Sequence, residues 1–331
     1  MHTRISRILM LALAAFLPWA CEREFDPKLS DSDNQLLLEG VVAGDGGIRL
    51  TLSRVTPIGA SYLVRTNDFM VEEISVTADG RSVKAQKQDA QHWFVAGENA
   101  PGSSLELSIR AYDAGALRAR TTVPPRPVID GAEVTLAESQ EDEGTVVQIA
   151  LSLGEEIRPE DRFGLFVDRE MTTVVVTPQG EEYTYSNILN LGQTLPTEDA
   201  YLERLMQGKA RMDIKFSPDG KDGEQMLMLH GADLQDGKIS AFYATKADHR
   251  VELLPGYKST TRYRFRCRLY RLSPELYSYL AAQYNKDNAG TSRYGLAPAN
   301  YNYSNVQGGY GVFGAISPCA ETPWLGNALV E

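Results

Sequence analysis

The chain has 331 residues, of which 33 are Lys or Arg and 44 are Asp or Glu, so its formal net charge at pH 7 is −11. Nucleic acids are bound by clustered Lys and Arg, and an acidic surface repels their phosphates, so we expect no nucleic-acid partner. At roughly 100 to 200 residues per domain, the length predicts two folded domains.

The first 20 residues predict an export signal. Arg4 and Arg7 precede the apolar run Ile8 to Leu17, and the small Ala20 stands just before Cys21. The run is shorter than the roughly 20 apolar residues of a membrane-spanning helix. Its basic start and small final residue are typical of a signal peptide. We therefore predict that the signal is removed directly before the cysteine.

Cys21 resembles the cysteine of a bacterial lipobox. In a lipobox the thiol carries a diacylglycerol and the new amino terminus is acylated, and several acyl chains together make a stable anchor. Pro18 stands where Leu is usual, so ordinary secretion with Cys21 as a plain thiol is the alternative. We expect Cys21 to be lipidated and to hold the protein on a membrane.

Residues 21–34 predict a flexible tether between the lipid and the folded body. Their sequence is polar and acidic and has no hydrophobic periodicity. Glu22, Glu24 and Asp26 form a loose version of the acidic run that resembles a surface-export signal of Bacteroidetes lipoproteins. This resemblance implies an anchor on the cell surface.

An immunoglobulin-like β domain is predicted for residues 35–125. Apolar residues alternate with polar ones around the turn Gly44 to Gly47, which predicts a hairpin. A second hairpin is predicted around Asp79-Gly80, and short strands at this spacing are typical of a sandwich. The prolines between Thr121 and Pro127 cannot donate to a sheet ladder, so we place the domain boundary after Pro125.

Residues 126–331 predict a second, larger β-sandwich-type domain, because further strands alternate with Pro and Gly turns. Two short helices interrupt it. Thr197 to Met206 starts with a capping Thr and early acids, and Ser273 to Leu280 starts with Ser and Pro, which favour a first helical turn. The predicted fold class is all-β with two short packing helices.

Cys267 and Cys319 are the cysteines that remain once Cys21 is lipidated. An even number of cysteines in an exported chain permits one disulfide. Cys267 lies on the apolar side of a strict alternation, however, and free cysteine is often buried. A disulfide and two separate thiols therefore both stay open.

A row of four arginines occupies one face of a single predicted strand, at steps of roughly 6.5 Å. Its members are Arg262, Arg264, Arg266 and Arg268. The row could clamp an anionic ligand or the acidic patch of a partner. The alternative, which the net negative charge favours, is pairing with this protein's own acids on neighbouring strands.

No motif of an enzyme, metal site or cofactor site is complete. Gly309 to Gly314 fits G-x-G-x-x-G, but prolines follow where a nucleotide site needs a helix, so the glycines indicate backbones in close approach. The acid-rich Glu138 to Glu143 and Asp219 to Glu224 are better explained as a solvated loop and a turn. We expect no metal, no cofactor and no catalytic residue. The paired carboxylates of a hydrolase leave no sequence spacing, so that reading stays open.

Several segments, in this order, resemble the domain of unknown function 4249 family of Bacteroidetes lipoproteins. They are Cys21-Glu22, LLLEGVV at 36–42, ARTTVPPRPVI at 119–129, SPELYSYL at 273–280 and SNVQGGYGVFGA at 304–315. The resemblance implies an outer-membrane lipoprotein with an immunoglobulin-like first domain, commonly encoded beside a TonB-dependent transporter. The family motif here consists of Asn305, Gly308, Gly309, Gly311, Phe313 and Gly314, as a structural signature or as a partner contact.

These features together predict an outer-membrane, surface-exposed lipoprotein that is not an enzyme. We expect it to serve as an accessory or ligand-capture partner of a TonB-dependent nutrient transporter, which supplies the energy. A structural or adhesive, fimbria-like lipoprotein is the alternative, and a hydrolase is a third reading.

Overall fold

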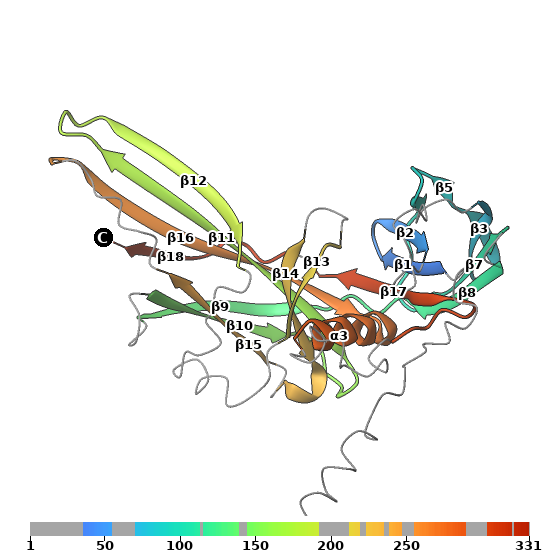
Figure 1. Cartoon of the computed structure of the whole chain (residues 1–331). Coiled ribbons are helices and arrows are strands. Elements are labelled where there is room, and N and C mark those ends of the chain that lie inside the picture. Colours follow the sequence, from blue (N-terminus) through green and yellow to red (C-terminus); the bar gives the residue numbers. More distant parts are fainter. Residues whose placement is uncertain are drawn as a thin grey trace, which may run out of the picture.

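The computed structural model describes residues 36–54, 70–112, 115–138, 144–191, 212–218, 223–234, 238–246, 255–288, 303–319 and 321–330. The predicted signal peptide, Cys21, the tether and the helix Thr197 to Met206 lie outside the described residues. Strands dominate this part of the chain, so the all-β prediction is confirmed (Figure 1). None of its helices has both the length and the apolar character needed to cross a membrane.

The first sandwich packs two sheets against each other. One sheet contains β1 (Leu36–Ala43), β2 (Gly47–Arg54), β6 (His92–Val95) and β5 (Gln86–Lys87). The other contains β4 (Arg81–Lys84), β3 (Val71–Ala78), β7 (Ser104–Ala111) and β8 (Gly115–Thr122). Alternate side chains along these strands meet in one core, among them Leu38, Leu50 and Ile109. Burying each such side chain contributes about 1.5–3 kcal/mol.

Both predicted hairpins of this sandwich are confirmed. Ala43 pairs with Gly47 at the end of the β1–β2 hairpin. Asp79 and Gly80 join β3 to β4 with φ angles of 49° and 78°. Positive φ at both central residues is the geometry of a two-residue turn whose twist matches its strands.

The second sandwich packs a small sheet against a large one. The small sheet is β15 (Lys238–Lys246), β10 (Gly144–Leu153) and β9 (Ile129–Glu138). Facing it are β14 (Glu224–His230), β11 (Arg162–Val176) and β16 (Lys258–Leu272), flanked by β13 (Met212–Phe216), β12 (Glu182–Asn190) and β18 (Leu325–Val330). Phe163, Phe265 and Ile149 lie in the core between them. In Figure 1 the outer parts of β11, β12 and β16 rise away from β9 and β10.

Helix α3 (Pro274–Asn288) confirms the second predicted helix. The hydroxyl of Ser273 accepts a hydrogen bond from the Leu276 amide (3.3 Å), and Pro274 occupies the first turn, where its missing N–H costs nothing. The Ser273 hydroxyl also accepts from the Ala315 amide (3.1 Å). The cap therefore also ties the helix to the C-terminal part of the sheet. A short 3₁₀ turn, η3 (Gly231–Asp233), follows β14.

Strand β17 (Tyr310–Pro318) connects the two sandwiches. It runs parallel to β1, from Leu37 opposite Tyr310 to Ala43 opposite Ile316, and antiparallel to the end of β16. Among the described strands, one sheet of 11 therefore passes through both sandwiches. Phe313, which the predicted division at residue 125 assigns to the second domain, lies in the core of the first.

Candidate functional site

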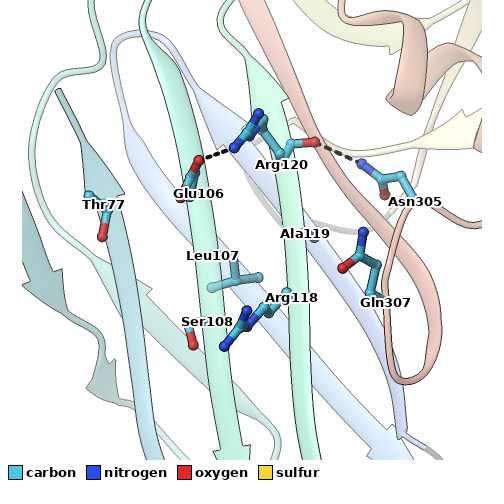
Figure 2. A pocket seen from close by; sticks show the side chains of 9 residues that line it. All are labelled: Thr77, Glu106, Leu107, Ser108, Arg118, Ala119, Arg120, Asn305 and Gln307. Carbon is cyan, nitrogen blue, oxygen red and sulfur yellow. Dashed lines mark hydrogen bonds and ion pairs between the residues drawn. The ribbon is translucent and has the colours of Figure 1, made fainter. Parts of the chain in front are cut away.

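A polar groove of about 650 Å³ lies on the outer face of the β3–β7–β8 sheet (Figure 2). We call it the β8 groove, and it is lined by Thr77, Glu106, Leu107, Ser108, Arg118, Ala119, Arg120, Asn305 and Gln307. The segment 303–309 forms one wall, because Gln307 and Arg118 exchange backbone hydrogen bonds of 2.8 and 3.0 Å. The segment 303–309 thus covers the edge of β8, and the chain then continues into β17.

The side chains of the β8 groove are polar because its strands alternate. Leu107 and Ala119 point inward and are buried in the sandwich core, while Glu106 and Arg120 stand on the outer face as an ion pair. Arg118 is also on the outer face, and in Figure 2 it reaches from β8 toward Ser108 of β7. It has no acidic partner among the described residues.

Asn305 of the predicted family motif is a hydrogen-bonding bridge. Its side-chain amide donates to the Phe313 carbonyl (2.8 Å) and accepts from the Phe313 amide (2.9 Å). It also donates to the Arg120 carbonyl at 3.1 Å, a bond drawn in Figure 2. The side chain therefore joins β17 to β8, across the two sheets of the first sandwich.

The motif glycines lie where two segments meet too closely for a Cβ. At Gly311, with φ +109°, a Cβ would overlap the Leu38 carbonyl oxygen of β1. At Gly314 it would come within 2.6 Å of the Leu276 Cβ on α3. A Cβ at Gly308 would overlap the Ala116 carbonyl oxygen on β8, and one at Gly309 would come within 2.6 Å of the Leu36 carbonyl oxygen on β1. The motif thus builds the junction between β17, the first sandwich and α3.

The comparison with protein families agrees with this geometry. Residues 22–319 match the model of the domain of unknown function DUF4249. The chain belongs to this family. The match includes the whole motif and every described strand except β18, so the predicted resemblance to this family is confirmed. None of the curated proteins compared with the chain matches it.

In this DUF4249 protein the arginine row of β16 is largely neutralised by its own acids. Arg264 binds Glu170 of β11, with a 2.6 Å bond from its Nε. Arg266 and Arg268 each reach Asp168 of the same strand at 3.0 Å. Arg266 also pairs with Glu321 (2.8 Å), and Arg268 with Glu224 (2.9 Å). For these three arginines, pairing with the protein's own acids is therefore the arrangement found, which was the alternative to clamping an external anion.

Two features of the row were not visible in the sequence. Asp168 is buried between two guanidinium groups, and the Trp324 ring lies 5.6 and 5.0 Å from those of Arg264 and Arg266. Cation–π contacts of this kind add to the ion pairs. Arg262, further out on β16, is exposed and forms no ion pair within the described ranges.

Cys267 and Cys319 both bear thiols and belong to the core of the second sandwich. Cys267 is fully buried, and its backbone amide donates to the Thr322 hydroxyl at 2.9 Å. Burial raises the pKa of the Cys267 thiol to about 12. A thiol in this state is a core side chain and not a nucleophile.

Strand β12 forms an open edge of this DUF4249 fold. Its nine residues pair with β11, from Asp168 opposite Asn190 to Val176 opposite Glu182, and no other described strand borders it. Four large apolar side chains on it are between 45 % and 63 % exposed: Tyr183, Tyr185, Ile188 and Leu189. We call this surface the β12 edge.

The described residues contain no cluster of three or more His, Cys, Asp or Glu that could hold a metal ion. His92 instead pairs with Asp89 through its Nδ1 at 2.8 Å, and His230 caps η3 by accepting from the Ala232 amide at 3.1 Å. Both histidines thus have local structural partners.

Proposed function

We propose that this DUF4249 protein is a lipid-anchored, non-catalytic accessory of a TonB-dependent transporter at the outer membrane, where it captures ligand for the transporter. Cys21, directly after the predicted signal peptide, would supply the anchor. The resemblance to the family's lipoproteins supplies the transporter as partner. In this arrangement the lipoprotein needs surfaces for a partner and for a ligand, and the transporter supplies the energy.

The observation that carries the proposal is the β12 edge. An edge strand offers unpaired backbone N–H and C=O groups, and soluble proteins usually protect such edges with charged residues or proline. Residues 183–190 of β12 contain neither, and they expose two tyrosines together with two aliphatic side chains. Tyr183, Tyr185 and Leu189 share one face of the strand and Ile188 lies on the other, and exposed tyrosine and aliphatic groups of this kind are typical of protein interfaces.

A transporter pull-down with matched variants tests the docking role. The tagged, lipidated protein is recovered from its native outer membrane in mild detergent, and bound proteins are identified by mass spectrometry. Tyr185→Lys combined with Ile188→Lys places a charge on each face of β12. Val83→Lys on β4, another exposed apolar residue of an edge strand, is the control.

We expect a stoichiometric TonB-dependent transporter with the wild type and with Val83→Lys, and its loss with the β12 double variant. Recovery of the transporter with all three proteins would place docking elsewhere and remove the support of the β12 edge. A protein recovered alone, or as polymers of itself, would overturn the accessory role. Polymers that the β12 variant abolishes would favour the adhesive reading, because a free edge can also pair with a second copy.

A further inference from the structure

Three neighbouring rows of side chains cross the outer face of the β3–β7–β8 sheet, and in two of them a glutamate of one strand pairs with an arginine of the next. In the first row, Glu73 of β3 lies opposite Arg110 of β7, and the two form an ion pair. Lys84 of β4, which lies opposite Ser75 in the middle row, also reaches Glu73 at 2.8 Å. In the third row, Glu106 of β7 lies opposite Arg120 of β8, again as an ion pair.

The described strands place two cations and no acid in the middle row, with Lys84 at its β4 end and Arg118 at its β8 end. Arg118 of β8 lies opposite Ser108 of β7, which in turn lies opposite Ser75 of β3. Serines therefore occupy the positions at which the neighbouring rows carry glutamates. Arg118 is exposed and meets no carboxylate in the described part of the chain, so its guanidinium is available for an external anion. The β8 groove is lined by Ser108 and Arg118 of this row, together with Thr77, Glu106 and Arg120 of the third row.

Hydroxyl and amide groups surround this guanidinium. Ser108, Thr77 and the exposed Gln307 side chain line the groove, and each can donate or accept a hydrogen bond. Glu106, the one acid in the lining, is held by Arg120. The groove thus combines a local excess of positive charge with neutral polar groups, although the chain as a whole is acidic.

We propose that the β8 groove binds an acidic saccharide, whose carboxylate is held by Arg118. A guanidinium presents two parallel N–H donors that match both oxygens of a carboxylate. The hydroxyls and the amide beside it suit the hydroxyl groups of a sugar ring. Apolar ligands do not fit, because the two apolar lining residues point into the core and an apolar group would cover polar atoms without replacing their hydrogen bonds.

This inference names the ligand class for the capture half of the proposed function, and it is independent of docking to the transporter. The test is therefore made on the purified mature protein in detergent, without any transporter. Trigalacturonate, its neutral counterpart galactotriose, and an acetylated dipeptide with a free carboxylate are titrated by calorimetry. The β12 double variant is included as well. Its substitutions lie outside the β8 groove, so we expect it to bind the saccharide even if it no longer docks to the transporter.

Arg118→Ala and Arg110→Ala form the matched pair of variants. Both arginines are exposed on the same face of the same sheet, but Arg110 lies outside the groove and is paired with Glu73. We expect trigalacturonate to bind the wild type, Arg110→Ala and the β12 variant alike, with a loss of about tenfold or more in Arg118→Ala. Arg118→Lys keeps the positive charge but lacks the paired N–H donors of a guanidinium, so its affinity for trigalacturonate should lie between those of the wild type and Arg118→Ala.

Results of three kinds would overturn the inference. The first is absence of trigalacturonate binding. The second is equal binding of galactotriose, or affinity unchanged in Arg118→Ala, since either removes the carboxylate contact. The third is a dipeptide that binds as tightly as the saccharide, which would assign the groove to peptide carboxylates. A thermal unfolding curve for each variant confirms that exposed Arg118 was replaced without unfolding the sandwich.

Discussion

One side chain, that of Asn305, satisfies both backbone polar groups of Phe313, with bonds of 2.8 Å to its carbonyl and 2.9 Å from its amide. Asn305 stands before the tight turn at Gly308 and Phe313 lies within β17. The amide takes the place of a neighbouring strand at the point where the chain changes from one sheet to the other.

We predict that Asn305→Asp lowers the free energy of unfolding by about 1–3 kcal/mol, because the Phe313 and Arg120 carbonyls lose their donor and face a carboxylate. Urea denaturation measures this difference. Gln307→Glu is the control, since Gln307 pairs with β8 through its backbone and exposes its side chain. Equal stability of the two variants would contradict the bridging role of Asn305.

We predict that Gly311→Ala destabilises the protein more than Gly102→Ala does. Both glycines have positive φ, +109° and +86°, so both substitutions carry backbone strain of about 1–3 kcal/mol. A Cβ at Gly102 meets nothing within 4 Å, whereas at Gly311 it would overlap the Leu38 carbonyl. Only Gly311→Ala should therefore loosen the β1–β17 pairing. Thermal unfolding compares the variants, and identical midpoints would contradict the close approach.

We predict that residues 21–126 alone do not form a stable domain, because β17 supplies Phe313 and Ala315 to its core and covers the edge of β1. A peptide of residues 303–319 added in trans should restore β structure, followed by circular dichroism and by hydrogen exchange of β1 amides. The same peptide with Phe313→Ala should rescue poorly, since such a truncation costs about 3–5 kcal/mol. Stable folding without any peptide would show that β17 is dispensable.

We predict that Cys267 contributes to a loss of stability at alkaline pH. Its pKa is about 12 in the folded protein and near 9 when exposed, so the unfolded chain releases this proton first as pH rises. The contribution of the buried Cys267 thiol to the free energy of unfolding is complete below about pH 9. Above that pH it is lost at roughly 1.4 kcal/mol per pH unit.

Between about pH 8 and about pH 10, the free energy of unfolding should therefore fall by roughly 1 kcal/mol more in the wild type than in Cys267→Ala. Raised tyrosine pKa values act on both proteins equally, so the comparison isolates the thiol. Parallel pH profiles would show that Cys267 ionises freely in the folded state. A thiol reagent at neutral pH should likewise leave Cys267 unmodified until the protein unfolds.

Local chemistry in the sequence determined the elements whose cause lies within a few residues. Asp79-Gly80 specifies its turn because both positions need positive φ, and Ser273-Pro274 specifies a helix start because capping and the missing N–H act within one turn. Period-two alternation likewise placed Cys267 on the buried face of β16 and the row from Arg262 to Arg268 on the other face. The clustered glycines of the motif indicated close backbone approach, although not toward which strands.

Only the tertiary structure decided which distant segments meet. The acids that bind Arg266 and Arg268 lie on β11, on β14 and just after β17, and strand alternation carries no information about such partners. The β8 groove likewise needs the register that sets Ser108 beside Arg118, and the return of Gln307 to the edge of β8. Register and strand order depend on packing over the whole core, because each pairing is weak and the buried faces select among them together. The sequence therefore determined the strands and their buried faces, and the fold alone determined the surfaces available for binding.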